Sequence, residues 1–567
     1  MKGNHAPSTL LVAVISLAIN PDHAASFSPP HRGSASTWHR TCTFSHTAQL
    51  QRRRISSSRL YVKRKPSEQQ RKGTLSPLRN LPLEDALEIE LLEMEAELDL
   101  AKPRDEQEEQ PQQIKATDAA SIIAGTAIGG GFLALPSVTS PLGYGPAALG
   151  LILAWTFLLL SATAFIEAAG LVADLRDMEN ANGVGGLPNG PDIAVAQEGA
   201  TSVATVIRYA FGKKAALVGG SLFIAQMLAV VTAQVVKGAE LFSDCLGIPY
   251  LLGCLAPTSL AGLFAFGSKA EVVERANTAL TFMMVGGFAA LIIGTIASGN
   301  VGKAAGAIFS RADYGQLLPK SGGAWALPVF INMLCFGQSM PLVVERMVQG
   351  RSSSSENSNN EEDAGDATRD RAPSLLRARS ATLLGAAVPL VLTVTWAAIS
   401  TALVKPSISN PLAFLLSRGP AIAVPVGLLA TGAIGTTLLG SFLAMGHFAS
   451  DIVCMKLGYC SLSWMKICNA FTVAIPSILA CVGPSLYLPL LSFSGAYPTT
   501  ILHGLAPALA AIALRRRVRR AGVEDGAPGV TPPVVPGGDA TLIGLAGTAI
   551  GLIGASTWLA LRHFVHG

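Results

Sequence analysis

The chain has 567 residues, of which 50% are hydrophobic and 14% are charged, and its mean hydropathy is +0.43. Soluble domains carry roughly 25% charged residues, so this composition excludes an ordinary soluble protein and predicts a membrane protein. The net charge of +5 is spread over loops and a basic N-terminus, and it does not indicate a nucleic-acid partner.

Residues 1–75 have the composition of a targeting leader. Up to Pro66 the only acidic residue is Asp22, while Arg and Lys accumulate among many Ser and Thr residues, as in a transit peptide. An apolar run at 10–19, too short to span a membrane, is followed by a small-residue site and Phe27. This arrangement resembles the bipartite leader of algae with complex plastids, whose cleavage motif centres on such a Phe. We therefore expect a plastid envelope protein, with an ordinary secretory signal as the alternative.

Two further segments are expected to be soluble. Residues 76–116 are acidic, and 81–100 within them predict a helix with carboxylates between leucines. Its apolar positions could form a short docking stripe, although a solvated helix or spacer fits as well. Residues 350–372 are rich in Ser, Asn and acidic residues, which predicts a disordered loop.

Residues 117–561 predict an all-α domain of eleven helices in the lipid bilayer. Each uncharged apolar run is near the about 20 residues that a spanning helix needs. The runs lie at 119–136, 149–165, 215–236, 248–267, 276–298, 324–344, 381–404, 421–446, 467–482, 488–514 and 540–561. Strands of a membrane barrel would instead alternate over about ten residues. The excess of Lys and Arg in alternate loops places the N-terminus inside.

The first run contains the segment GTAIGGGFLALP at 125–136, with three consecutive glycines at its middle. Glycines weaken a helix and add no side chain to bury. Unwound backbone is tolerated at membrane depth only where it is buried in protein or lines a polar cavity. The segment therefore predicts a broken helix at a ligand site.

This segment closely resembles the first-helix signature of the hydroxy and aromatic amino acid permeases, the tryptophan and tyrosine permease branch of the amino acid, polyamine and organocation superfamily. Further stretches agree in order: VERAN at 273–277, GSFLA at 440–444, and GAY at 495–497 with LHGLAPA at 502–508. The resemblance runs from about 118 to 561. It implies a secondary active transporter of tryptophan or tyrosine that works as a proton symporter. It also implies a fold like that of the bacterial leucine transporter, with two inverted five-helix repeats, an eleventh helix and substrate at the midplane.

An inverted repeat predicts that the sixth helix is broken where the first one is. The run at 324–344 does contain FGQS at 336–339, between Pro328 and Pro341. Two interrupted helices that open the two halves are typical of a transporter's binding site. Glycines used only for close helix packing are the alternative.

The ends of broken helices suggest how an amino acid is held. A carboxylate is favoured at the N-terminus of a half-helix, and an ammonium at exposed carbonyls of a C-terminal end. We therefore assign the backbone N–H groups of Gly129, Gly130 and Gly131 to the carboxylate. The carbonyls around Gly125 and Thr126 are assigned to the ammonium.

The sixth-helix break is expected to complete the site. Carbonyls near Phe336 and Gly337 would also face the ammonium, and selectivity would come from Phe336, Gln338, Ser339 and the third helix around Gln226. Bacterial relatives carry Phe-Gly-Phe-His or a similar pattern here. Gln338 and Ser339 depart from that pattern, which leaves the identity of the aromatic substrate open.

Coupling has two sets of candidates. Charges within membrane segments are functional candidates by default, and Glu167 and Lys237, the latter near Glu240, are such charges. Both lie near helix ends, where capping also explains them. Sodium is the alternative ion: relatives with this fold complete a cation site with hydroxyls of the eighth helix, where Thr437 and Ser441 share a face. Protons are favoured by the resemblance.

Other function classes find little support. The eight cysteines show no CxxC spacing, and no hydrolase, zinc-protease or phosphate-loop motif is present, so we expect no enzyme, cofactor or metal. The remaining alternatives are a transporter of another neutral amino acid and a non-transporting amino acid sensor, which would use the acidic helix at 81–100 as its docking element.

Overall fold

The computed structural model describes residues 115–127, 129–181, 202–297, 306, 314–317, 326–349, 371–408, 410–457, 462–520 and 531–566. The predicted leader and nearly all of the acidic segment 76–116 lie outside these residues. So does most of the predicted loop 350–372. At its end that prediction was wrong, because a helix already begins at Arg371.

A helical segment stands at each of the eleven predicted runs. They are α4 (Ala116–Ala127) with α5 (Leu135–Leu142), α6 (Tyr144–Ala181), α8 (Lys213–Leu246), α9 (Tyr250–Gly267), α10 (Ala270–Ala297), α12 (Ala326–Met333) with α13 (Met340–Val344), α16 (Arg371–Leu403), α18 (Pro420–Leu457), α19 (Leu462–Ala480), α20 (Tyr487–Ser494) with α21 (Ala506–Arg520), and α22 (Gly538–His566). Among the described residues, nine helices are long and apolar enough to cross a membrane, ten if α4 and α5 form one span, and Trp464–Ala480 is a shorter apolar helix. The protein is an integral, multi-pass membrane protein.

The contacts between helices follow a twofold pattern. α8 packs on α9 as α18 packs on α19, α8 contacts α19 as α18 contacts α9, and α10 packs along α18 as α20 packs along α8. These contacts of the first five spans therefore have counterparts five spans later. An odd number of spans reverses the second repeat in the membrane. The predicted fold class, a leucine-transporter-like 5+5 inverted repeat plus an eleventh helix, is confirmed.

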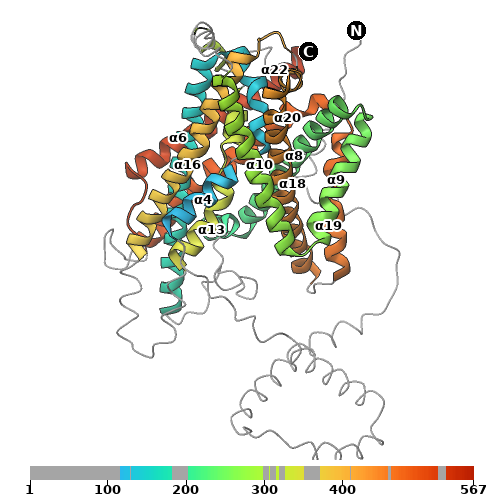
Figure 1. Ribbon diagram of the computed structural model, residues 1–567. Coiled ribbons are helices and arrows are strands. Elements are labelled where there is room, and N and C mark those ends of the chain that lie inside the picture. Colours follow the sequence, from blue (N-terminus) through green and yellow to red (C-terminus); the bar gives the residue numbers. More distant parts are fainter. Residues whose placement is uncertain are drawn as a thin grey trace, which may run out of the picture. The chain divides into compact units, whose positions relative to one another are not determined.

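The spans form two groups (Figure 1). We call α4, α5, α6, α12, α13 and α16 the bundle group, because α16 and α6 contact the other members. We call α8, α9, α18 and α19 the scaffold group, because these four pack on one another. α20 contacts both α8 and α12, so it lies between the groups.

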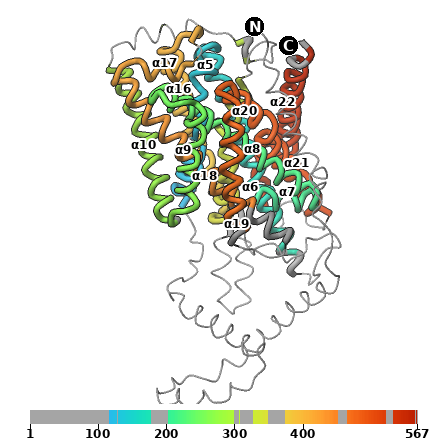
Figure 2. The backbone as a smooth tube through the Cα atoms, turned by 90° about the vertical axis from the view of Figure 1, so that its right-hand side faces the viewer, coloured from blue at the N-terminus to red at the C-terminus, as the bar shows by residue number. Residues whose placement is uncertain are grey.

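The C-terminal helices flank the bundle group. α21 packs on α6, on α22 and on the short α7 (Val203–Phe211), and these helices lie side by side in Figure 2. The chain between α21 and α22 returns along α6, where residues 531–535 are held by buried carboxylates. The eleventh helix is thus tied to the second.

Glycines allow α10 and α18 to approach closely. A Cβ atom added at Gly432 would lie 2.6 Å from the Leu280 carbonyl oxygen and 2.7 Å from the Met284 nitrogen. Both atoms belong to backbone, which cannot move aside as a flexible side chain can. Gly287 faces the backbone of α18 in the same way, with the Leu429 nitrogen at 2.7 Å.

We predict that Gly432→Ala lowers the melting temperature of the purified protein in detergent. Overpacking a close backbone contact costs about 1–3 kcal/mol. Gly440→Ala is the matched control on α18, because a Cβ at that exposed position meets nothing within 4 Å. Equal melting temperatures for the two variants would contradict this description of the interface.

Candidate functional site

The first spanning helix is broken at its glycine run. α4 ends at Ala127, Gly129 is extended (φ −137°, ψ −167°), and a 3₁₀ turn, η4 (Gly130–Ala134), leads into α5. The two halves are bent by 44°. The bare backbone lets neighbours approach: a Cβ at Gly130 would lie 1.8 Å from the Gln234 Oε1 atom, and one at Gly131 would lie 3.2 Å from the Met333 Cα atom.

The sixth spanning helix is broken at the predicted residues. α12 ends at Met333, the chain is non-helical through Phe336, and a short 3₁₀ turn, η7 (Gly337–Ser339), precedes α13. The Phe336 carbonyl accepts the Ser339 hydroxyl at 2.8 Å and the Ser339 N–H at 3.1 Å. The hydrogen bonds to the Phe336 carbonyl are therefore formed by a residue of the same break.

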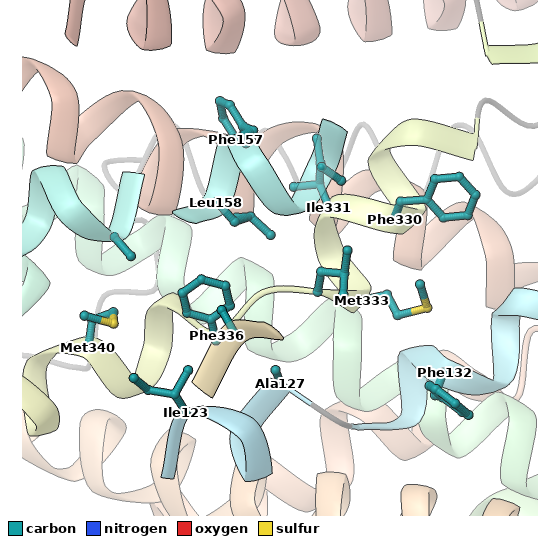
Figure 3. Close-up of a cluster of buried hydrophobic side chains, with 14 of the residues drawn as sticks. Ile123, Ala127, Phe132, Phe157, Leu158, Phe330, Ile331, Met333, Phe336 and Met340 are labelled. Carbon is teal, nitrogen blue, oxygen red and sulfur yellow. The ribbon is translucent and has the colours of Figure 1, made fainter. Parts of the chain in front are cut away.

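The two breaks lie against each other. Gly131 packs on Met333, and η4 contacts α12 as α4 contacts η7. Figure 3 shows Ile123 and Ala127 of α4 facing Phe336 and Met340 of the sixth helix. The two breaks predicted from the sequence are therefore adjacent in space, although they belong to different repeats.

Side chains from distant helices satisfy the backbone of the first break. The Gly130 N–H donates to the Thr437 hydroxyl of α18 at 2.7 Å, and the Tyr487 hydroxyl of α20 donates to the Gly130 carbonyl at 3.3 Å. The Trp396 indole N–H of α16 donates to the Phe132 carbonyl at 3.0 Å, and its ring stacks on the Phe132 ring. Thr437 thus contacts the first helix, and its assignment to a sodium site stays a prediction. Ser441 lies one turn farther along α18 and is half-buried.

The other residues assigned to the ligand near the first break already form hydrogen bonds within the protein. Gly125 and Thr126 form the last turn of α4, and the Thr126 hydroxyl donates to the Ile122 carbonyl at 3.0 Å. Gln226 is buried on α8, and its Nε2 atom donates to the Thr499 hydroxyl at 3.1 Å, while its Oε1 atom has no partner. These assignments stay predictions.

The predicted residues of the sixth break differ in exposure. Phe336 and Ser339 are buried, and the Ser339 hydroxyl is engaged by Phe336, whose carbonyl we had assigned to the ammonium. Gln338 is exposed. Gly337 lies against the ring of His503, whose Nδ1 atom would be 2.4 Å from an added Cβ. The roles given to all four residues stay predictions.

Lys237 is connected to the first break. Its Nζ atom pairs with the Glu240 carboxylate at 2.7 Å, lies 3.5 Å from the Asn410 Oδ1 atom, and sits 5.4 Å from the centre of the Tyr487 ring. Tyr487 in turn holds the Gly130 carbonyl. Tyr487 thus stands between the Lys237 ammonium and the first break.

Glu167 lies in a different network. Its carboxylate accepts the Arg515 Nε–H at 2.5 Å and the backbone N–H groups of Val534 and Val535 at 2.8 and 2.9 Å. Arg515 also pairs with Asp539 at 2.6 Å. These partners join α6 to α21 and to the segment before α22. In this structure Glu167 anchors the C-terminal helices.

Sequence reasoning missed four residues near the breaks: Gln234, Trp396, Tyr487 and His503. Gln234 is fully buried, and neither of its amide atoms has a hydrogen-bond partner. Its polar side chain in an apolar run was a signal, but Gln226 carries the same signal two turns earlier. His503 belongs to a motif quoted only for its family resemblance.

A small cavity lies behind the sixth break, and Ser161, Gly337 and His503 contribute to its wall together with Leu158, Ala162, Phe165, Met340 and Pro507. The Ser161 Oγ and His503 Nε2 atoms are buried without a partner. Within the described ranges no three His, Cys, Asp or Glu side chains gather as they would around a metal ion.

Comparison with known proteins supports the predicted relationship. The model of the tryptophan/tyrosine permease family matches residues 112–353, a stretch that contains both breaks. This match supports a secondary transporter of aromatic amino acids rather than an enzyme. None of the curated proteins compared with the chain matches it.

Solved structures of transporters are similar to the chain at low identity. A mutant of the manganese transporter of Eremococcus coleocola is 12% identical, with a TM-score of 0.44, and the match covers 81% of this chain and 97% of that one. A Na⁺-coupled sialic acid symporter, in a substrate-bound outward-open state, is 12% identical with a TM-score of 0.46, over 82% of this chain and 92% of the other.

We predict that Glu167→Gln destabilises the protein by about 3 kcal/mol, because it breaks a buried ion pair and places amide hydrogens against N–H donors. Thermal unfolding in detergent measures the loss. Glu271→Gln is the control, since its pair with Arg275 is 82% exposed on both sides. An unchanged melting temperature together with uptake that no longer responds to pH would favour the coupling role instead.

Proposed function

We propose that the protein is a secondary active transporter that carries tryptophan or tyrosine across a membrane by alternating access. The observation that carries this proposal is the pair of broken helices packed against each other within a stretch that matches the permease family. Midplane sites of transporters are formed by such discontinuous helices.

The half-helix ends suit an amino acid. The turn at Gly129, Gly130 and Gly131 begins a half-helix, so its N–H groups favour a carboxylate. The Gly130 N–H is held by Thr437, so a carboxylate there would replace or share that bond. The end of α4 at Gly125 and Thr126 presents carbonyls to an ammonium.

The aromatic side chain of the ligand would lie toward the sixth helix. Phe336 is a large buried apolar group at that break, and Gln226 holds an unpartnered amide oxygen on the facing third helix. Tryptophan and tyrosine both offer a ring donor that such an oxygen accepts. Gln338 and Ser339 border this region and would tune the choice between them.

The packing provides the moving parts. The bundle group carries both breaks, whereas the partners of Gly130 at the first break lie on α18 of the scaffold group and on α20. Rocking of one group against the other would open the site to either side in turn. Binding at the breaks would then be linked to the position of the groups.

We infer coupling to protons, with Lys237 as the better placed candidate. Lys237 reaches the first break through Tyr487, whereas Glu167 lies about 14 Å along α6 from Leu158, at 1.5 Å per residue. Sodium is the alternative, at the face of Thr437 and Ser441. Thr437 already uses its hydroxyl as donor and acceptor, which leaves one lone pair for an ion.

Uptake into proteoliposomes tests this function. We expect an inward proton gradient to drive the accumulation of labelled tryptophan or tyrosine. In Lys237→Met, accumulation should no longer depend on that gradient. The double variant Thr437→Val with Ser441→Ala tests the sodium alternative. If only a sodium gradient drives accumulation, and the double variant abolishes it, then sodium and not the proton is the coupling ion. Binding without exchange would contradict transport and favour a sensor.

We further propose that residues 1–75 direct the protein to a plastid envelope, on the strength of their basic, acid-poor composition and the site at Phe27. A fluorescent protein fused behind residues 1–75 should reach the plastid in an alga with a complex plastid. The same fusion with Phe27→Ala should stop short of it. Secretion of both fusions would support the ordinary secretory alternative.

A further inference from the structure

One polar side chain in the third spanning helix has no hydrogen-bond partner. Gln234 is 0% exposed, and its Oε1 and Nε2 atoms are both unpaired. Its neighbours on α8 are Ala233, Val235 and Val236, which are also buried. An unsatisfied buried amide is costly, and in a native protein such a group calls for a ligand, water or functional explanation.

The amide is aimed at the first break. A Cβ atom added at Gly130 would lie 1.8 Å from its Oε1 atom, 2.1 Å from its Cδ atom and 2.5 Å from its Nε2 atom. The backbone of Gly130, which the amide covers, forms no hydrogen bond with it: the Gly130 N–H donates to Thr437, and the Gly130 carbonyl accepts from Tyr487. An open hydrogen-bonding group thus stands at the centre of the break.

Other unpaired polar atoms near the breaks are explained otherwise. Gln226 is held by Thr499 on the tenth span through its Nε2 atom, and its unpaired Oε1 atom is assigned above to the ring donor of the ligand. The Ser161 and His503 atoms share one small cavity behind the sixth break, and Gln234 does not line that cavity. Gln234 alone among these residues touches the glycine run.

We propose that Gln234 binds the ligand directly, as a residue that selects zwitterionic α-amino acids. This proposal rests on the proposed function. A primary amide donates through its nitrogen and accepts through its oxygen, so one side chain can donate to the carboxylate and accept from the ammonium of the same ligand. Gly130 is then required because any side chain there would displace the Gln234 amide.

The test compares Gln234→Met with Thr232→Val in proteoliposomes. Methionine keeps the length of the side chain and removes both polar atoms, while Thr232 is a buried residue of the same helix whose hydroxyl bonds only the Leu228 carbonyl. We expect Gln234→Met to raise the KM for tryptophan at least about tenfold, since bonds to charged groups are lost. Thr232→Val should keep the KM.

Stability separates this role from a structural one. Replacing an unsatisfied amide by an apolar side chain of similar shape is neutral or stabilising. The melting temperature of Gln234→Met should therefore equal or exceed that of the wild type. A fall in melting temperature with an unchanged KM would overturn the proposal.

Competition by analogues gives a second readout. Tryptamine lacks the carboxylate and indole-3-propionate lacks the ammonium, so each forfeits one bond to Gln234. In the wild type, tryptophan should compete far better than either analogue, and in Gln234→Met this advantage should shrink. An advantage equal to that of the wild type would overturn the proposal.

A double substitution tests the role of Gly130. Gly130→Ala alone should raise the KM for tryptophan as Gln234→Met does, because its Cβ displaces the amide. Gly130→Ala with Gln234→Ala should bind tryptophan no more weakly than Gly130→Ala alone, because the amide that the Cβ displaces is already absent. Full affinity in the double variant would overturn the proposal, since it would make Gln234 dispensable. A wild-type protein that takes up no aromatic amino acid would overturn the proposed function itself, and that result does not depend on any variant.

Discussion

The structure depends on hydrogen-bond partners for the backbone N–H and carbonyl of one residue at membrane depth, Gly130. Inside a bilayer an unpaired backbone group costs several kcal/mol, and a continuous helix avoids this cost by internal bonds. The first helix is interrupted, so its partners come from elsewhere: Thr437 accepts from the N–H, and Tyr487 donates to the carbonyl. These side chains belong to the eighth and tenth spans. Packing of the repeats and local geometry of the break therefore determine each other.

Much of the fold could be predicted from the sequence because the bilayer sets the length of an apolar run. Each predicted run corresponds to a helical segment, and the two breaks were predicted from glycines and prolines in matching places. Helix ends were predicted less well. α6 was expected at 149–165 and extends from Tyr144 to Ala181, because a helix continues beyond the lipid wherever nothing in the sequence ends it.

The contacts of the site could not be predicted in the same way, because they depend on which faces meet. Gln226 and Gln234 give the same signal, a polar residue in an apolar helix, yet one is tied to Thr499 and the other covers Gly130. Glu167 and Lys237 are likewise both buried charges. The first is enclosed by Arg515 and backbone N–H groups, while the second lies against Tyr487 at the break. Burial alone does not show what a charged residue does. Its hydrogen-bond and ring partners show which part of the structure it belongs to.

The two breaks are satisfied in different ways, and this difference bears on how binding is linked to movement. The Phe336 carbonyl accepts hydrogen bonds from Ser339 of the same segment. The sixth break therefore keeps these hydrogen bonds when its helix moves. The first break keeps its bonds only while α18 and α20 stay in place around Gly130. Displacement of the bundle group from these helices would free the Gly130 N–H and carbonyl, and a bound carboxylate could then take the place of the Thr437 hydroxyl. The hydrogen bonds of the first break therefore depend on the positions of α18 and α20, whereas those of the sixth break do not.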